Sequence, residues 1–179
     1  YRWYDARGLD VAFPFGHGLS YTTFDYTDAA ATVNADGDID VAVTVTNTGA
    51  VPGREVVQVY TGLPGSKVTR PPRELKAFAV VELDSAESRR VTATVRRKDL
   101  AYWDIRVNSW VVEAGAHTVE VAASSRFSEE VVVGAEGVVS HRPSLPQAQA
   151  QERRNSIRPG ESVDRRGHKA VIGWEITGQ

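Results

Sequence analysis

The chain has 179 residues, with 21 Lys and Arg against 23 Asp and Glu for a net charge of −2, and it contains neither Cys nor Met. The absence of cysteine excludes disulfide frameworks, thiolate zinc sites, iron–sulfur clusters and thiol nucleophiles. The longest apolar runs have about five residues, whereas a membrane-spanning helix needs about 20, and the near-neutral charge argues against a nucleic-acid-binding protein. We therefore expect neither a membrane nor a nucleic acid as partner.

The length predicts one domain with additional segments, because single domains typically have about 100 to 150 residues. A complete translation product begins with Met, whereas this chain begins with Tyr1 and has no Met. We therefore expect a processed product or a piece of a longer protein. The composition is compatible with a cytoplasmic and with a secreted protein.

Residues 1–24 are rich in aromatic side chains and follow neither a strand nor a helix pattern. Pro14 fixes the backbone, and two nearby glycines are free to adopt positive φ angles, so the segment can turn sharply. These features are typical of a connector held between two domains. We expect four aromatic side chains to pack against a neighbouring domain: Phe13, Phe15, Tyr21 and Phe24.

Residues 25–136 alternate apolar and polar side chains and are punctuated by turn residues about every ten positions, which predicts β-strands. Trp110 is a candidate to fill the centre of the core. A hairpin turn at residues 113–116 is expected to join the two strands around it. The predicted strands are 39–46, 55–61, 74–83, 88–96, 109–113, 117–123 and 127–133.

About seven strands at this spacing predict an all-β fold, an immunoglobulin-like β-sandwich. The chain lacks the Cys…Trp…Cys signature of true immunoglobulin domains, which favours the fibronectin type III-like branch.

Residues 137–179 differ in composition from the rest of the chain. Residues 1–140 hold 14 basic and 19 acidic side chains, whereas residues 141–179 hold 7 basic and 4 acidic ones, with many Pro and Gln and few large apolar residues. Such a segment cannot bury enough surface to order itself, so we expect a largely disordered tail. The apolar stretch 170–176 could add a strand.

Several motifs occur along the first 130 residues, in this order: YRWYD at 1–5, FPFGHGLSYTTF at 13–24, VTNTG at 45–49, GREVVQVY at 53–60, RPPRELKAF at 70–78 and WVVEAG at 110–115. Together they closely resemble the C-terminal part of glycoside hydrolase family 3 enzymes, the β-glucosidases and β-xylosidases. The resemblance implies that residues 1–24 are the end of a preceding α/β-sandwich domain with its interdomain linker, and that residues 25–136 are a fibronectin type III-like domain.

The resemblance also implies what the chain does and lacks. The parent enzymes hydrolyse terminal β-glycosidic bonds with retention and without an organic cofactor, and their nucleophilic Asp lies in a Ser-Asp-Trp motif upstream of the matched region. That motif is absent here. We therefore expect no catalytic residue, no metal and no cofactor, and a structural role with the catalytic domains of the parent glycosidase as partners.

Other residue patterns are weaker as candidate sites. Retaining glycosidases need two carboxylates about 5 Å apart, and Asp99 with Asp104 is one candidate pair, although charges in solvated loops explain these residues as well. Residues 36–40 begin like a calcium loop but lack its Gly and Glu at the required later positions. The segments 16–18 and 62–67 lack the spacing of nucleotide-binding loops.

Serine and histidine side chains offer no better site. Ser124, Ser125 and His117 are of the residue types found in a hydrolase triad, but nothing in the sequence places a serine on a nucleophile elbow. The histidines are too scattered to predict a metal site: His17, His117, His141 and His168.

Exposed aromatic side chains leave a second function open, because sugar-binding surfaces use flat rings for stacking. Packing in the core or between domains is the commoner role of such side chains. The alternatives to an accessory module are therefore a stand-alone module that binds an oligo- or polysaccharide or a protein, and a truncated product without function. The aromatic candidates for saccharide contact are Trp3, Tyr4, Tyr102 and Trp103.

Overall fold

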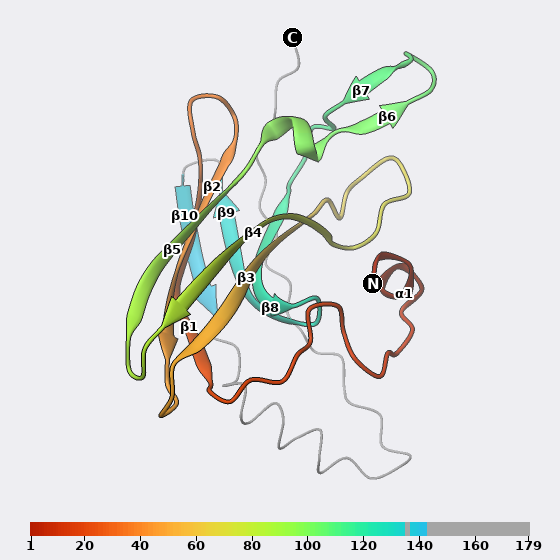
Figure 1. Ribbon diagram of the computed structural model, residues 1–179. Helices are drawn as coiled ribbons and strands as arrows, with labels where there is room; N and C mark the ends of the chain where they lie inside the picture. The colour runs from red at the N-terminus through yellow and green to blue at the C-terminus, as the bar shows by residue number, and fades with distance from the viewer. Residues whose placement is uncertain (135–136, 143–179) are drawn as a thin grey trace.

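The computed structural model describes residues 1–134 and 137–142, and nearly all of its regular structure is β (Figure 1). The helical elements are α1 (Arg2–Arg7) and the short 3-10 helix η1 (Arg97–Leu100). The strands are β1 (Phe24–Val33), β2 (Ile39–Asn47), β3 (Gly53–Gly62), β4 (Glu74–Leu83), β5 (Ser88–Val95), β6 (Tyr102–Asp104), β7 (Ser109–Val111), β8 (Thr118–Ser124), β9 (Phe127–Gly134) and β10 (Gly137–Arg142).

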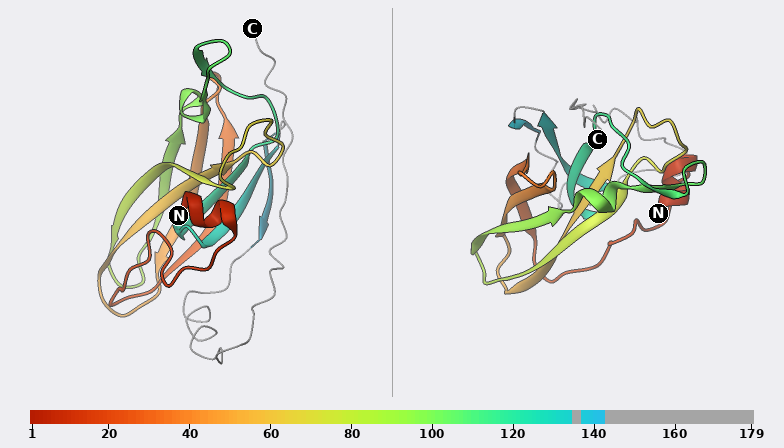
Figure 2. Two further views of the ribbon diagram at one scale, coloured as in Figure 1. Left: turned by 90° about the vertical axis from the view of Figure 1, so that its right-hand side faces the viewer. Right: turned by 90° about the horizontal axis from the view of Figure 1, so that it is seen from above.

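The strands form two sheets that face each other, with a small hairpin attached at one end (Figures 1 and 2). One sheet has three strands in the order β1-β2-β5, and the other has five in the order β10-β9-β8-β3-β4. All strand pairs are antiparallel. The chain passes from one sheet to the other after β2, after β4 and again between β5 and β8. The predicted all-β, fibronectin type III-like sandwich is confirmed.

The core lies between the two sheets and consists mainly of valine side chains. In β2 every second residue from Ile39 to Val45 is at most 2% exposed. Val57 and Val59 of β3 face them from the other sheet, together with Val119 and Val121 of β8. Burial of each such side chain contributes about 1.5 to 3 kcal/mol, so the alternating pattern that predicts the strands also fixes which face turns inward.

The strand that contains Trp110 does not belong to the sandwich. Residues 109–111 form β7, which pairs with β6 rather than with β8, and the Trp110 side chain is 67% exposed. The prediction that Trp110 fills the core is therefore wrong, as is the predicted hairpin between residues 109–113 and 117–123. The closely packed aliphatic core leaves no place for an indole, and β8 takes β3 and β9 as its partners.

Three further elements differ from the prediction. The short helix α1 lies in the segment for which no regular element was expected, and β1 precedes the first predicted strand at 39–46. At the other end, β10 pairs with β9 across the predicted domain boundary after residue 136. The rest of the predicted tail 137–179, from residue 143 onward and with the apolar stretch 170–176, lies outside the described residues.

The helices within residues 1–134 and 137–142 are both short, and neither is long and apolar enough to cross a bilayer.

Candidate functional site

The N-terminal segment lies on the outer face of the five-stranded sheet (Figure 2). The ring of Tyr1 contacts the ring of Tyr60 edge-on at 5.7 Å between centroids and that of Phe15 at 5.3 Å. The backbone N–H of Leu75 donates a hydrogen bond of 2.8 Å to the Tyr1 hydroxyl. Tyr60 points away from the core, and it is nevertheless fully buried because this segment covers it.

A charged cluster holds the same segment to β8 and its neighbours. The Arg73 guanidinium lies 2.9 Å from Glu120 on β8 and 4.0 Å from the Asp5 carboxylate of α1. Arg126 forms a second ion pair with Asp5 at 3.2 Å and donates a hydrogen bond to the carbonyl of Leu9. Asp5 is therefore the acid that joins the helix to two arginines of the domain.

Close backbone contact fixes the segment further along. The N–H of Ser125 donates to the carbonyl of Phe15 at 2.8 Å. The next residue, Gly16, has φ +84°, and a Cβ there would come within 2.3 Å of the Gln58 side-chain amide. Gln58 is itself held by Tyr60 and by the carbonyl of Ala123, so this position requires glycine.

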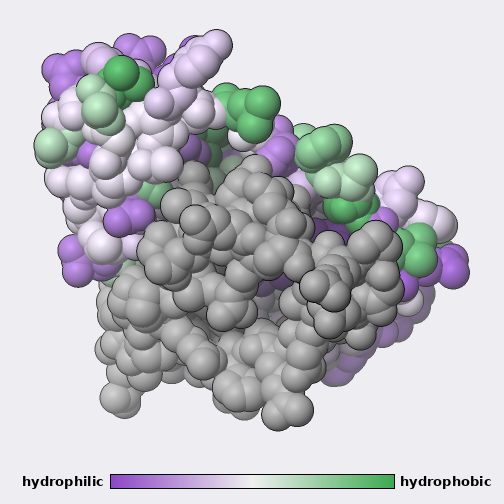
Figure 3. All heavy atoms as spheres, turned by 90° about the horizontal axis from the view of Figure 1, so that it is seen from below, coloured by the Kyte–Doolittle hydropathy of each residue, from purple (hydrophilic) through white to green (hydrophobic). Residues whose placement is uncertain are grey.

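Between these fixed points, large apolar side chains project into solvent. Phe13 is 70% exposed and Tyr21 is fully exposed, whereas Phe15 is half-exposed. Leu19, which the sequence analysis did not single out, is 92% exposed. We call Leu9, Phe13, Phe15, Leu19 and Tyr21 the N-terminal apolar surface. In the view from below, apolar side chains form several separate areas beside the grey atoms (Figure 3).

Phe24 does not belong to this surface. It is the first residue of β1, is 2% exposed and packs in the core of its own sandwich against Gly53. The prediction that it packs against a neighbouring domain is wrong, because the alternation of β1 turns its first side chain inward.

The hairpin β6–β7 projects from the end of the sandwich and carries two adjacent indoles. The rings of Trp103 and Trp110 meet edge-on, with centroids 5.6 Å apart and an interplanar angle of 77°. They are 45% and 67% exposed. Ile105 and Val107, between the two strands, are also exposed.

One buried carboxylate holds the hairpin in shape. Asp104 accepts two hydrogen bonds from the Arg106 side chain, at 2.6 and 3.0 Å, and one from the Arg106 backbone N–H at 2.9 Å. The Tyr102 hydroxyl donates a further bond at 3.2 Å. These contacts with Arg106 hold the pKa of Asp104 far below its ordinary value. Contacts within the chain therefore hold the turn in shape without a bound partner.

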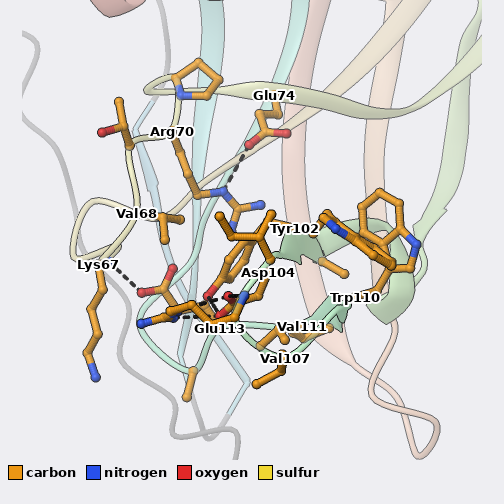
Figure 4. Close-up of a pocket in the computed structure, with 18 of the residues that line it drawn as sticks. Lys67, Val68, Arg70, Glu74, Tyr102, Asp104, Val107, Trp110, Val111 and Glu113 are labelled. Atoms are coloured by element: carbon orange, nitrogen blue, oxygen red, sulfur yellow. Dashed lines mark hydrogen bonds and ion pairs between the residues drawn. The ribbon is translucent and has the colours of Figure 1, made fainter.

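A groove of about 1140 Å³ separates the hairpin from the loop before β4 (Figure 4). At its centre the Arg70 guanidinium binds Glu74 at 3.2 Å and the carbonyl of Leu100 at 2.9 Å, and it lies 6.0 Å from the centroid of the Tyr102 ring. One of its nitrogens, Nη1, is buried without a hydrogen-bond partner among the described residues.

Glu113 forms another wall of this groove. Its carboxylate accepts hydrogen bonds from the Ser66 hydroxyl at 2.6 Å and from the backbone N–H of Lys67 at 2.5 Å. Partial burial raises the pKa of Glu113, but these hydrogen bonds outweigh it and hold the pKa below its ordinary value. In Figure 4 the Lys67 side chain extends away from this carboxylate.

The structure does not assemble the carboxylates and serines into a catalytic site. Asp99 pairs with Arg96 at 2.8 Å and Asp104 with Arg106, so each candidate acid is bound to its own arginine. The hydroxyls of Ser124 and Ser125 are buried without a hydrogen-bond partner in the described part of the chain.

The histidines have packing roles where the structure describes them. His117 is buried, and burial lowers its pKa. His17 stacks on Phe13 at 5.1 Å between ring centroids. The side chain of His141 and the whole of His168 lie outside what the structure describes.

Residues 36–40 form the end of a turn and the start of β2, not a calcium loop. The side-chain oxygen of Asn34 accepts hydrogen bonds from the N–H groups of Asp36 and Asp38, each at 3.1 Å. Asp40 binds Thr94 on the neighbouring strand. Within residues 1–134 and 137–142, no three acidic or histidine side chains are placed to hold a metal ion.

Of the four aromatic candidates, Trp3 and Tyr4 lie on α1, where Trp3 is 59% exposed under the guanidinium of Arg7. Tyr102 and Trp103 lie on the hairpin, where the structure adds Trp110 to them. The sequence contains a signal for this hairpin, because two short aromatic segments flank Asn108. Asn108 adopts the left-handed conformation at φ 49°, which asparagine tolerates better than most residue types.

Comparison with known proteins places these features in a family. The fibronectin type III-like domain family matches residues 55–125. The β-glucosidase BoGH3A of Bacteroides ovatus is 44% identical over 128 residues, which are 70% of this chain and 17% of that protein. An exo-α-(1→6)-L-arabinopyranosidase of Bifidobacterium breve is 44% identical over 138 residues, or 76% of this chain and 18% of that protein.

The solved structures agree with the sequence relatives. The crystal structure of the Bifidobacterium adolescentis GH3 β-glucosidase superimposes with a TM-score of 0.72 at 40% identity, covering 81% of this chain and 22% of that one. The chain thus spans less than a quarter of the length of these relatives. It carries a fibronectin type III-like domain that matches the C-terminal part of glycoside hydrolase family 3 enzymes.

Proposed function

We propose that the chain is the accessory module of a β-glycosidase and seats itself on the catalytic domains through the N-terminal apolar surface. The observation that carries this proposal is the exposure of Phe13, Leu19 and Tyr21 on a segment whose other parts are fixed to the sandwich. Large apolar side chains that gather on one segment and remain exposed are typical of an interaction site. The relatives support it, because in them the corresponding domain is a small part of a much longer enzyme.

The activity of the proposed parent enzyme is the hydrolysis of terminal β-glycosidic bonds, with nucleophile and acid supplied by other domains. The sugar preference does not follow from the relatives, since they include a β-glucosidase and an L-arabinopyranosidase. We expect the chain alone to release no product from aryl β-glycosides. Turnover that a single Asp or Glu substitution abolishes would contradict a purely structural role.

A chimera tests the docking. The C-terminal part of the Bacteroides ovatus β-glucosidase, which this chain matches at 44% identity, is replaced by residues 1–179. We expect an active enzyme whose melting temperature falls in a Phe13→Ser, Leu19→Ser, Tyr21→Ser variant. The matched control is Phe78→Ser, which removes a side chain that is 65% exposed on β4, outside the N-terminal apolar surface. Equal melting temperatures for both variants would reject this surface as the docking site.

The hairpin supports a second candidate function, the binding of an oligo- or polysaccharide. Trp103 and Trp110 offer two accessible indoles beside an open groove, and rings of this kind stack on the apolar faces of sugars while their N–H groups stay available to hydroxyls. Affinity electrophoresis in gels with cellulose derivatives, xylan and β-glucan tests it. Absence of retardation in all of them would remove this candidate and leave the accessory role untouched.

A further inference from the structure

Basic side chains concentrate around the β6–β7 hairpin. A second groove of about 770 Å³ adjoins the first, and Trp110 lines both. Together the two grooves are lined by seven basic and four acidic side chains, although residues 1–140 as a whole hold 14 basic and 19 acidic ones. The hairpin end is therefore a locally cationic region of an acidic domain.

The four acids do not neutralise this excess. Glu74 is shared by Arg2, Arg70 and Lys76 at 2.9 to 3.3 Å. Asp99 and Asp104 are each bound to one arginine. The remaining acid, Glu113, is occupied by a hydroxyl and a backbone N–H.

Two lysines remain available to an anion. Lys67 in the first groove and Lys98 in the second are exposed. Neither takes part in a salt bridge within residues 1–134 and 137–142. The buried Nη1 of Arg70 adds a cationic nitrogen without a hydrogen-bond partner there. Opposite charge attracts a ligand over about 8 Å at physiological ionic strength.

We propose that the hairpin and its two grooves bind a saccharide chain that carries carboxylates, that is, an oligo- or polysaccharide containing uronic acid residues. Sugar rings stack on the indoles of Trp103 and Trp110, and the carboxylates meet Lys67 and Lys98 on the two sides. This proposal rests on the saccharide-binding function proposed above. A saccharide fits better than an acidic peptide because two exposed indoles offer ring surfaces beside the cations, on a hairpin whose turn is braced by the Asp104–Arg106 bonds.

The test compares the full chain on two polymers that differ only in charge: glucuronoxylan, and the same glucuronoxylan with its carboxylates reduced to alcohols. Poly-L-glutamate serves as an acidic polymer without sugar rings. We expect retention by glucuronoxylan, weakened by salt and by carboxylate reduction. Trp110→Ala and the double change Lys67→Gln, Lys98→Gln should each weaken it by about fivefold or more.

Two control variants guard against general loss of structure or of charge. Phe78→Ala removes an exposed aromatic side chain outside both grooves, and Arg54→Gln removes an exposed cation on β3. Both should bind glucuronoxylan as the unchanged chain does, and all variants should have the same melting temperature within error.

The possible outcomes distinguish failure of this inference from failure of the saccharide-binding function and of the accessory role. Equal binding of intact and reduced glucuronoxylan would overturn the acidic ligand while saccharide binding stands. If poly-L-glutamate binds as well as glucuronoxylan does, and if Trp110→Ala leaves that binding unchanged, the ligand is an acidic peptide and the inference is overturned. No binding of any polymer would overturn both the inference and the saccharide function, but not the accessory role, which the chimera tests by itself.

Discussion

At the scale of single residues, the ends of the strands depend on a buried amide. The Asn47 side chain is fully buried where β2 ends. Its oxygen accepts hydrogen bonds from the Thr22 hydroxyl at 2.5 Å and the Gly49 N–H at 3.0 Å. Its nitrogen donates to the carbonyls of Val51 and Leu83. One side chain thus satisfies four groups from three separate segments.

Removal of this amide should destabilise the sandwich strongly. Asn47→Ala leaves buried donors and acceptors without partners, so we expect the free energy of unfolding to fall by about 3 kcal/mol. Urea unfolding measured by fluorescence checks the value. Thr92→Ala, at an exposed position of the neighbouring sheet strand β5, should change it by less than about 0.5 kcal/mol. A similar small effect for Asn47→Ala would show that water replaces the amide.

A partly buried carboxylate gives the domain a distinctive dependence on pH. Glu55 on β3 accepts a hydrogen bond of 3.0 Å from the Tyr26 hydroxyl of β1. Burial raises the pKa of Glu55, and this effect outweighs the lowering by the hydrogen bonds from Tyr26 and Val56. The same burial, together with the Glu55 charge, raises the pKa of Tyr26. In the folded state Glu55 therefore holds its proton to a higher pH than in the unfolded chain.

The sign of the effect follows from proton binding. Between the ordinary glutamate pKa near 4.3 and the raised value in the fold, the folded state binds more protons, so the contribution of Glu55 to stability is lost as the pH rises. Glu55→Gln keeps the acceptor for Tyr26 and should be more stable than the unchanged chain at pH 7, with the difference vanishing below pH 4. Urea unfolding at a series of pH values measures it. A difference that grows toward acid pH would contradict the raised pKa.

At the scale of elements, the sequence predicts the inner part of the sandwich, strands β2 to β5, β8 and β9, better than the strands β1 and β10 or the hairpin β6–β7. Strands β2 and β5 alternate between a core face and a more open face, so their pattern is readable from residues such as Val41 and Val43. The hairpin β6–β7 has only three residues in each strand and no inward face. Trp110 therefore resembles a core residue in the sequence, and only the pairing of β6 with β7 shows that it lies outside.

The contacts of the N-terminal segment were likewise beyond prediction. The sequence indicates that Phe13, Phe15 and Tyr21 belong to a connector, but the cluster of Asp5, Arg73 and Arg126 joins residues more than 60 positions apart. No local pattern marks such long-range ion pairs. The segment is consequently more firmly attached to the domain than its composition suggests.

The hairpin should come apart locally when its central carboxylate is removed. Asp104→Ala eliminates the acceptor of the Arg106 and Tyr102 hydrogen bonds. Because the core lies in the two sheets, we expect amide hydrogen exchange to accelerate across residues 102–111 while the melting temperature changes little. Asp99→Ala, which breaks an exposed ion pair with Arg96, is the matched control and should leave exchange in the hairpin unchanged. Unaltered exchange in Asp104→Ala would show that strand pairing alone holds the hairpin.

At the scale of the whole molecule, two surfaces of different chemistry lie on one rigid sandwich. The N-terminal apolar surface offers the exposed side chains of Phe13, Leu19 and Tyr21. At the hairpin end, the exposed indoles of Trp103 and Trp110 lie beside the basic side chains of the two grooves. The first chemistry suits a dry protein interface, and the second suits a polar ligand in water. One module can thus remain seated on an enzyme while its other end stays open.

The first of these surfaces should also govern how the isolated chain behaves in solution. Without a docking partner, exposed apolar side chains favour association between copies, so we expect a reversible, concentration-dependent increase in apparent mass in sedimentation equilibrium. Leu19→Ser with Tyr21→Ser removes two almost fully exposed side chains. It should weaken association by about a hundredfold or more, because burial of each is worth about 1.5 kcal/mol or more and every 1.4 kcal/mol changes an equilibrium constant about tenfold. Phe78→Ser removes a large apolar side chain that is 65% exposed on β4, and it should leave association unchanged. A monomer at every concentration before any substitution would show that the N-terminal apolar surface is too small to hold two copies together, and docking on a catalytic domain would then need contacts from other parts of the sandwich.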